Sequence, residues 1–346
     1  MSSNNSRQLG LDAFRLLAAL SVIFLHVGYY EGLPRIFGAE MRLSGRWAVP
    51  FFFMLSGFFS APSLISDPNR IAHQSAKAFW VLIVSSLAMT PLLVWQLGLG
   101  DAAKKIISTE VLSQGTHFHL WFLSSLSFGL FVFFAMRIYG TNRSAMALVA
   151  LSLGIMIFDA YYPNGRPFQT FSRYLMCFPF LYLGMLIRWK NLRLTLSAAL
   201  GLTFLGVLLQ NVEAYVLREL FDKSPFQFDF LIGTIPFATG AFFLAMQLPE
   251  SPRLAVAARL GQKYSLGIYV FHPYFIYILT QGVPWNGRVY SLSIVPLTFV
   301  MTLLSLGIVF RYFPASERIL AASRGDLQRL DDLQPFPPAF PDAEDD

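Results

Sequence analysis

The first apolar stretch of the chain contains three ionisable side chains that would share one face of a helix. Asp12, Arg15 and His26 follow one another at intervals of three and eleven residues, with Ala19 and Val22 between them on the same face. Arg15 and His26 would lie ~16 Å apart along the helix axis. Because a neutral imidazole can take up a proton near pH 7, His26 is a candidate general base. Asp12 can form an ion pair with Arg15 one turn away.

A charged group in the middle of a bilayer costs at least ~2.5–3.5 kcal/mol, so such residues usually line a cavity or perform chemistry. With Asp12 at the cytosolic boundary, His26 would lie ~21 Å into the bilayer. Two structural explanations stay open. Asp12 and Arg15 could anchor the helix at the lipid headgroups, and His26 could be a neutral imidazole that bonds to a neighbouring helix.

A second histidine lies in a late apolar segment, three residues after Tyr269, so that Tyr269 and His272 face the same way. His272 would lie near the bilayer midplane, where the same energetic argument applies as for His26. Pro273 follows directly. Because a proline removes a backbone N–H and frees a carbonyl oxygen, we expect that oxygen to bond the imidazole of His272.

The composition indicates what kind of protein positions these groups. Of the 346 residues, 55% are hydrophobic and 13% are charged, whereas a soluble domain averages ~25% charged residues. The mean hydropathy is +0.52, and so few charges cannot cover a soluble globule. The single Cys177 excludes a disulfide scaffold and a cysteine-based metal site. The charges behind the net +6 are scattered, which predicts no nucleic-acid partner.

We therefore expect an all-α, polytopic membrane protein with about ten transmembrane helices in one bundle. A helix needs ~20 apolar residues to cross a bilayer, and the second and sixth candidates are short enough to be tilted, broken or partly re-entrant. The candidate spans are Gly10–Tyr30, Trp47–Pro62, Lys77–Leu97, His119–Tyr139, Ser144–Tyr161, Arg173–Arg188, Leu194–Leu217, Asp229–Leu248, Tyr264–Gln281 and Val289–Tyr312.

The predicted organisation has a cytosolic segment at 1–9, a single transmembrane domain at 10–312 and a cytosolic tail at 313–346. The end of the tail is proline-rich and acidic and is expected to be disordered. With the N-terminus inside, fifteen Lys and Arg side chains fall in cytosolic connections and ten in outer ones, which favours an N-in, C-in orientation. The charges of Asp12 and Arg15 argue against reading the first apolar run as a signal peptide.

Four segments resemble those of a known family, in the same order along the chain. Leu11–His26 reads LDAFRLLAALSVIFLH, in which ten residues separate Arg15 from His26. Together these segments resemble the acyltransferase family 3 membrane proteins, which transfer acyl groups, often acetyl, to hydroxyls of sugars and surface glycans. The other three segments are Val49–Phe59 (VPFFFMLSGFF), His119–Leu123 (HLWFL) and Ser265–Pro273 (SLGIYVFHP).

The resemblance implies a donor, an acceptor and a place in the cell. Acyl-CoA, with acetyl-CoA as the expected donor, would enter from the cytosol as a co-substrate, with no permanently bound cofactor and no metal. The acceptor would be a sugar or glycan on the outer side of a bacterial inner membrane. His26 would be the catalytic base, and Arg15 would contribute to catalysis and to donor binding. Arg70 and Lys77 would meet the phosphates of coenzyme A, although ordinary positive-inside flanking also explains them.

The expected acceptor site is an outward-facing pocket. Imidazoles and an indole would suit a sugar, whose C–H face stacks on aromatic rings while its hydroxyls bond polar groups. Tight helix packing at Ser56 and Gly57 and an interfacial aromatic belt at Trp121 are the structural alternatives, and His117 is expected to be a loop residue. The residues assigned to the acceptor are Ser56, His119, Trp121, Tyr269 and His272.

A transporter or flippase of a glycan-related or small-molecule substrate would also have many helices and ionisable residues near the midplane. Asp159, Asp222 or Asp229 could orient a histidine, and the sequence selects none of them. The acyl group, the acceptor and the oligomeric state are not predicted. Four glycines are expected to mark close helix contacts, namely Gly201, Gly206, Gly233 and Gly240.

Overall fold

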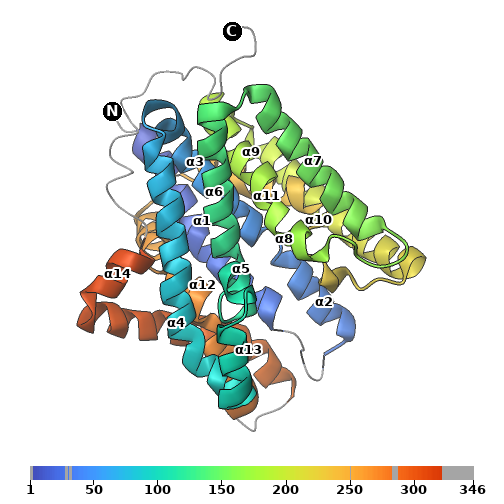
Figure 1. Ribbon diagram of the computed structural model, residues 1–346, viewed down its shortest axis with the longest axis vertical. Helices are drawn as coiled ribbons and strands as arrows, with labels where there is room; N and C mark the ends of the chain where they lie inside the picture. The colour runs from blue at the N-terminus through green and yellow to red at the C-terminus, as the bar shows by residue number, and fades with distance from the viewer. Residues whose placement is uncertain (1–2, 28–29, 31–32, 250, 283–286, 322–346) are drawn as a thin grey trace. The chain divides into compact units, whose positions relative to one another are not determined.

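The computed structural model describes residues 3–27, 30, 33–249, 251–282 and 287–321, and every regular element in these ranges is a helix (Figure 1). The elements are α1 (Ser3–His26), α2 (Arg35–Ser44), α3 (Ala48–Ser66), α4 (Asn69–Ile106), α5 (Glu110–Gln114), η1 (Phe118–Leu120), α6 (Trp121–Tyr139), α7 (Asn142–Tyr161), α8 (Gln169–Leu175), α9 (Cys177–Trp189), α10 (Leu196–Phe221), η2 (Pro225–Gln227), α11 (Thr234–Gln247), α12 (Pro252–Gly282), α13 (Arg288–Tyr312) and α14 (Pro314–Leu320).

Within the described residues, seven helical stretches are long and apolar enough to cross a membrane. They correspond to α1, to α2 and α3 together, and to α4, α6, α7, α10 and α13. The prediction of an all-α protein with several membrane-spanning helices is therefore confirmed. The other three predicted spans fall on α9, α11 and α12, which are helical but shorter or more polar, so the number of about ten stays a prediction.

Some helix boundaries differ from the expected ones. The sixth predicted span is broken, because α8 ends at Leu175 and α9 begins at Cys177. The α4 helix is interrupted at Gly98, whose φ of 76° is a conformation that glycine adopts without strain. The segment predicted as a disordered tail begins with α14, whose Leu320 is buried. The rest of that segment, 322–346, lies outside the described residues.

The described chain divides into two compact units. The first unit contains residues 3–52, 195–211 and 233–321, and the second contains 53–194 and 212–232. The helices α3 and α10 contribute residues to both units. The expectation of a single bundle over 10–312 stays a prediction.

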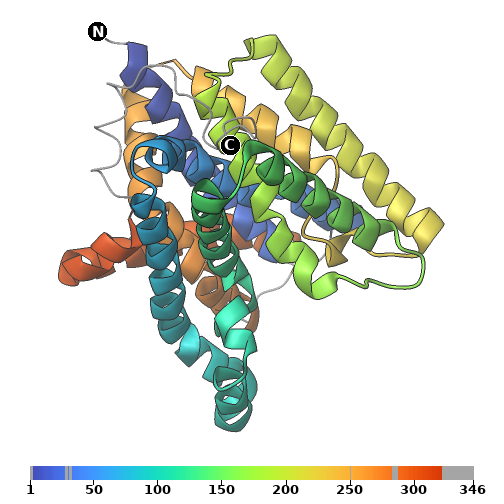
Figure 2. The ribbon, with the colours of Figure 1, turned by 45° about the horizontal axis from the view of Figure 1, so that its top comes forward.

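In the first unit, α1 lies along α12 and also contacts α11 and α13 (Figures 1 and 2). A Cβ atom on Gly261 of α12 would lie 1.9 Å from the carbonyl oxygen of Asp12, so the two backbones touch there. Further along, His272 of α12 meets His26 of α1. Because both contacts advance toward the C-terminal ends, the two helices are parallel, as the alternation of ten spans predicts for the first and ninth.

A cluster of aromatic rings packs α1 against the start of α3 and against α11. The ring centroid of Phe14 lies 6.1 Å from that of Trp47 and 6.2 Å from that of Phe51. Phe51 lies 5.7 Å from Phe242, and Trp47 lies 6.3 Å from Phe237. Edge-on and tilted contacts of this kind stabilise a core beyond the area that the rings bury.

Three of the four glycines expected at close helix contacts are confirmed. An added Cβ would lie 2.2 Å from a backbone atom at Gly206 and 2.4 Å from one at Gly233, and 2.3 Å from the hydroxyl of Thr203 at Gly240. The prediction is wrong for Gly201, which has nothing within 4 Å of an added Cβ. These contacts join α10 to α11, and Gly201 lies on the other face of α10.

In the second unit, α4 lies beside α6 (Figure 1). Two serines join these helices by reciprocal hydrogen bonds. Ser75 Oγ donates to the backbone carbonyl of Ser127 at 2.7 Å, and Ser127 Oγ donates to the backbone carbonyl of Ser75 at 2.9 Å. The helices α3 and α9 touch at two glycines. A Cβ on Gly57 would lie 2.0 Å from the carbonyl oxygen of Leu181, so the expected close packing at Gly57 is confirmed.

We predict that Gly261→Ala destabilises the first unit while Gly201→Ala does not. The first substitution pushes a methyl group into the backbone of α1 and should lower the free energy of unfolding by ~1–3 kcal/mol or more. The second places a methyl in open space and should be neutral or stabilise by ~0.5–1 kcal/mol. Thermal unfolding of the detergent-purified variants measures both effects. Equal melting temperatures would contradict the close contact of α1 with α12.

Candidate functional site

The structure brings the two expected membrane histidines together. The imidazole rings of His26 and His272 lie with their centroids 4.9 Å apart at an interplanar angle of 70°. His272 has no exposed surface, and His26 is partly buried. Tyr269 is buried one turn before His272, with its ring centroid 6.4 Å from that of the histidine. An imidazole pair of this kind can hold or pass a proton between two rings.

Backbone contacts fix which nitrogen of each ring is basic. Nδ1 of His26 lies 2.9 Å from the carbonyl oxygen of Val22, and Nδ1 of His272 lies 2.8 Å from that of Tyr269. A carbonyl oxygen only accepts, so Nδ1 donates in both rings and Nε2 carries the lone pair of each neutral imidazole. The N–H that Pro273 lacks would have bonded the Tyr269 carbonyl. The prediction that this proline frees a carbonyl for His272 is confirmed.

The face of α1 that carries Asp12, Arg15, Ala19, Val22 and His26 is called the stripe below. The ion pair expected at its start is present. Arg15 Nε lies 3.2 Å from Asp12 Oδ1, and the two side chains are only 12% and 8% exposed. Ala19 and Val22, further along the same face, have no exposed surface. The stripe therefore faces the protein interior, and anchoring at lipid headgroups does not account for Asp12 and Arg15.

The second unit holds His119 and Trp121, at the point where η1 leads into α6. His119 is buried, and its Nδ1 lies 2.7 Å from Nδ1 of His117, so one ring donates to the other. His117 lies in the connection before η1, as predicted. Its contact with His119 was not predicted, and the spacing of two residues is the signal that could have revealed it. Trp121 is buried under the guanidinium of Arg173, whose Cζ lies 5.4 Å from the indole centroid.

The remaining predicted residues also lie in the second unit. Arg70, at the start of α4, pairs with Asp67 at 3.1 Å, and both side chains are about half exposed. Lys77 is exposed two turns further along the same helix. Ser56 is partly buried on α3, next to the glycine that contacts α9. The roles of Arg70 and Lys77 in donor binding and of Ser56 in acceptor binding stay predictions.

The predicted residues are thus divided between the two units. The first unit brings together Arg15 on α1 with His26, Tyr269 and His272, and the second unit holds the other five. A common pocket for donor, base and acceptor stays a prediction. In the described part of the chain, no group of three or more histidine, cysteine, aspartate or glutamate side chains converges as a metal site would require.

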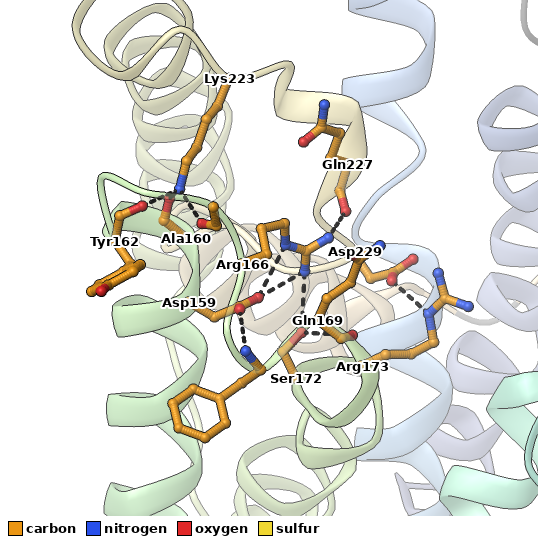
Figure 3. A network of polar contacts seen from close by, with 12 residues as sticks. Asp159, Ala160, Tyr162, Arg166, Gln169, Ser172, Arg173, Lys223, Gln227 and Asp229 are labelled. Carbon is orange, nitrogen blue, oxygen red and sulfur yellow. Dashed lines mark hydrogen bonds and ion pairs between the residues drawn. The ribbon is translucent and has the colours of Figure 1, made fainter.

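Sequence reasoning missed a polar network in the second unit, which Figure 3 shows. Asp159 near the end of α7 accepts from Arg166 Nη2 at 2.8 Å, from Arg166 Nε at 3.1 Å and from the backbone N–H of Phe168 at 2.8 Å. Arg166 also donates to Ser172 Oγ at 3.2 Å and to the carbonyl of Gln227. Asp159 therefore pairs with an arginine rather than orienting a histidine. No helical spacing links these residues, because Arg166 and Phe168 lie in the non-helical connection between α7 and α8.

A buried lysine caps the C-terminal end of α7 by hydrogen bonds to backbone carbonyls. Lys223 Nζ donates to the carbonyl oxygens of Ala160, Tyr162 and Gly165 at 3.0, 2.6 and 2.9 Å. These oxygens include helix-end carbonyls that have no partner within the helix, and a cation there complements the helix dipole. Burial lowers the pKa of Lys223, the nearby Asp159 acts against this shift, and Arg166 adds to it.

The network borders a small hollow in which a second ion pair lies. Arg173 Nε donates to Asp229 Oδ2 at 2.8 Å. The hollow is lined by Met156, Asp159, Arg166, Ser172, Arg173, Phe228, Asp229 and Phe230.

Comparison with known proteins decides the family. A family model described as an acyltransferase domain matches residues 8–310. The chain belongs to acyltransferase family 3. The matched range contains the imidazole pair, the Arg15 ion pair and the whole polar network, and the resemblance inferred from four short segments is confirmed.

Three curated relatives share part of their length with this acyltransferase-family chain. An amino-acid racemase of Enterococcus faecalis is 24% identical over 87% of this chain and 46% of its own length. A second amino-acid racemase of that organism is 27% identical over 46% of this chain and 23% of its own. A serine/alanine racemase of Enterococcus gallinarum is 26% identical over 77% and 40%. The chain thus spans less than half of each relative. No solved structure matches the chain.

We predict that Asp159→Asn destabilises this acyltransferase-family fold far more than Asp101→Asn. The Arg166–Asp159 pair is buried, with side chains 10% and 1% exposed, so removing the carboxylate should lower the free energy of unfolding by ~3–5 kcal/mol. The control pair, Lys104–Asp101, is 80% and 66% exposed, and its loss should cost ~0–1 kcal/mol. Melting temperatures of the purified variants test this, and a tolerated Asp159→Asn would show that the network is dispensable.

Proposed function

We propose that this chain is a membrane O-acyltransferase that moves an acyl group, expected to be acetyl, from cytosolic acyl-CoA to a hydroxyl of a sugar or glycan on the outer side of a bacterial inner membrane. The observation that carries the proposal is the pairing of two imidazoles deep in a membrane-type helix bundle. His26 and His272 lie on adjoining parallel helices, and each presents Nε2 as its basic nitrogen. Family membership supports the reaction class.

In the proposed reaction, His26 Nε2 removes the proton from the acceptor hydroxyl as its oxygen attacks the thioester carbonyl. The new oxygen–carbon bond forms the ester while the carbon–sulfur bond breaks, and the proton passes to the leaving thiolate to give free coenzyme A. A positioned base contributes ~10²–10⁴-fold, so orientation and charge stabilisation supply the rest. His272, which is buried beside His26, would hold the ring in place or take up the proton transiently.

The donor side of the proposal depends on basic residues. Arg15 lies ~16 Å from His26 along α1, so it is too distant to act on the base. We place it at the cytosolic mouth, where its guanidinium binds the donor and Asp12 keeps it oriented. Arg70 and Lys77 would bind the phosphates of coenzyme A. Only the extended arm of the donor could reach His26.

The acceptor would enter from the outer side. Trp121 and His119 in the second unit, and Tyr269 and His272 in the first, supply the aromatic and imidazole surfaces that suit a sugar. Ser56 would contribute a hydroxyl along the acyl path. This arrangement requires the N-in, C-in orientation that the loop charges favour.

A second candidate is a transporter or flippase of a small molecule. The racemase names of the relatives that match most of this chain favour a small amino-acid substrate for it. A transporter would accumulate its substrate in vesicles without releasing free thiol from acetyl-CoA. Release of free thiol that depends on an added glycan would support the acyltransferase.

We predict that His26→Ala abolishes release of coenzyme A thiol from acetyl-CoA in the presence of a glycan acceptor, because the group that takes the proton from the acceptor hydroxyl is lost. The protein should still insert and purify as a monodisperse species. Leu17→Ala changes an exposed residue of the same helix and should retain activity. Transfer by His26→Ala at the wild-type rate would end the assignment of this base.

We also predict that Arg15→Ala raises the KM for acetyl-CoA more than the KM for the acceptor, since a guanidinium at the cytosolic mouth contacts only the donor. Steady-state kinetics with each substrate varied in turn would measure this difference. Arg218→Ala removes an arginine that is 77% exposed and serves as the control. Equal losses for both substrates would assign Arg15 a structural role instead.

A further inference from the structure

The hollow in the second unit contains two Arg–Asp pairs that differ in how far their hydrogen-bonding capacity is used. Arg166 donates four hydrogen bonds within the protein, and both oxygens of Asp159 accept. That pair is 10% and 1% exposed. Four of the five N–H donors of Arg166 are used, so this pair has a structural role at the edge of the hollow and offers little to a ligand.

The second pair has unused capacity. Arg173 donates only through Nε, to Asp229 Oδ2, although a guanidinium carries five N–H donors. In the described part of the chain, no residue makes a hydrogen bond to its terminal nitrogens or to Asp229 Oδ1. Figure 3 shows the terminal nitrogens of Arg173 turned away from the other residues drawn. The side chains are 30% and 33% exposed, so these donors and this acceptor are accessible from outside.

We propose that Arg173 and Asp229 form a subsite for a hydroxyl-rich, sugar-like acceptor. A sugar hydroxyl both donates and accepts, so two neighbouring hydroxyls can bond the guanidinium and the carboxylate together. Phe228 and Phe230 line the same hollow, and the guanidinium of Arg173 covers the ring of Trp121. These rings are buried and hold the polar pair in position, so the guanidinium and the carboxylate are the groups offered to the ligand.

The charges favour a neutral sugar over an anion or a zwitterion. Arg173 and Asp229 lie 2.8 Å apart and largely neutralise each other, so a phosphate would gain little attraction and would meet the carboxylate. A zwitterionic amino acid would have to compete with the existing ion pair at both ends. A hydroxyl group can join the pair without breaking it.

The inference rests on the proposed function, because it names the acceptor class of that reaction, but direct binding can test it without acyl transfer. The full-length protein in detergent would be titrated with glucose, N-acetylglucosamine, glucuronate, serine and inorganic phosphate. Saturation-transfer NMR would detect the bound probe. We expect saturable binding of glucose or N-acetylglucosamine, weakened about 10-fold by Arg173→Gln and by Asp229→Asn.

Arg218→Gln provides the matched control, because Arg218 forms an exposed pair with Glu219 in the same unit. It should leave sugar binding unchanged, and melting temperatures would show that all variants are folded. Arg173→Lys keeps the positive charge but replaces the planar guanidinium by an ammonium group, so it should also weaken sugar binding.

Three results would overturn the inference. They are sugar binding that neither Arg173→Gln nor Asp229→Asn affects, saturable binding of serine or phosphate without sugar binding, and absence of binding by all five probes. If acyl transfer to a sugar is found and Arg173→Gln leaves its KM unchanged, the proposed function stands and this subsite does not. Sugar binding that depends on Arg173, in a protein that never releases thiol, would retain the subsite and remove the acyltransferase.

Discussion

The close contact of α1 with α12 is the constraint on which the proposed chemistry depends. Because Gly261 has no side chain, the backbone of α12 can lie against that of α1 at Asp12. The two helices then run parallel, and His272 arrives beside His26. In a bilayer there is no hydrophobic force between helices, so small residues and polar contacts must bring them together. A bulkier residue at position 261 would separate the helices and with them the two imidazoles.

The polar clusters described above are of two kinds. Asp159, Arg166 and Lys223 bond the connections at one end of the second unit, and their capacity is nearly exhausted. The Arg173–Asp229 pair retains donors and an acceptor. In the imidazole pair, Nδ1 of each ring bonds a backbone carbonyl, which leaves Nε2 as the basic nitrogen. This division separates groups that stabilise the fold from groups that can bind or react. It follows from the high cost of an unpaired polar group away from water.

Membership of acyltransferase family 3 and the imidazole pair support the same reaction class from independent directions. The family match covers nearly the whole chain, while the histidine contacts follow from the packing of α1 and α12. The racemase names belong to proteins more than twice the length matched here. They assign no racemase chemistry to this chain.

The sequence by itself determined the helical class, the inward stripe from Asp12 to His26, and the carbonyl that Pro273 leaves for His272, because these depend on helical periodicity and on the chemistry of proline. It also identified Gly206 and Gly240 as contact points, but not that Gly201 faces open space. Only the tertiary structure decided that His272 meets His26 and that Asp159 binds Arg166 and not a histidine. The first contact joins segments far apart in sequence, and helix periodicity says which face is buried but not which helix lies against it. The second depends on how the connection between α7 and α8 folds back on the end of α7, which no periodic pattern predicts.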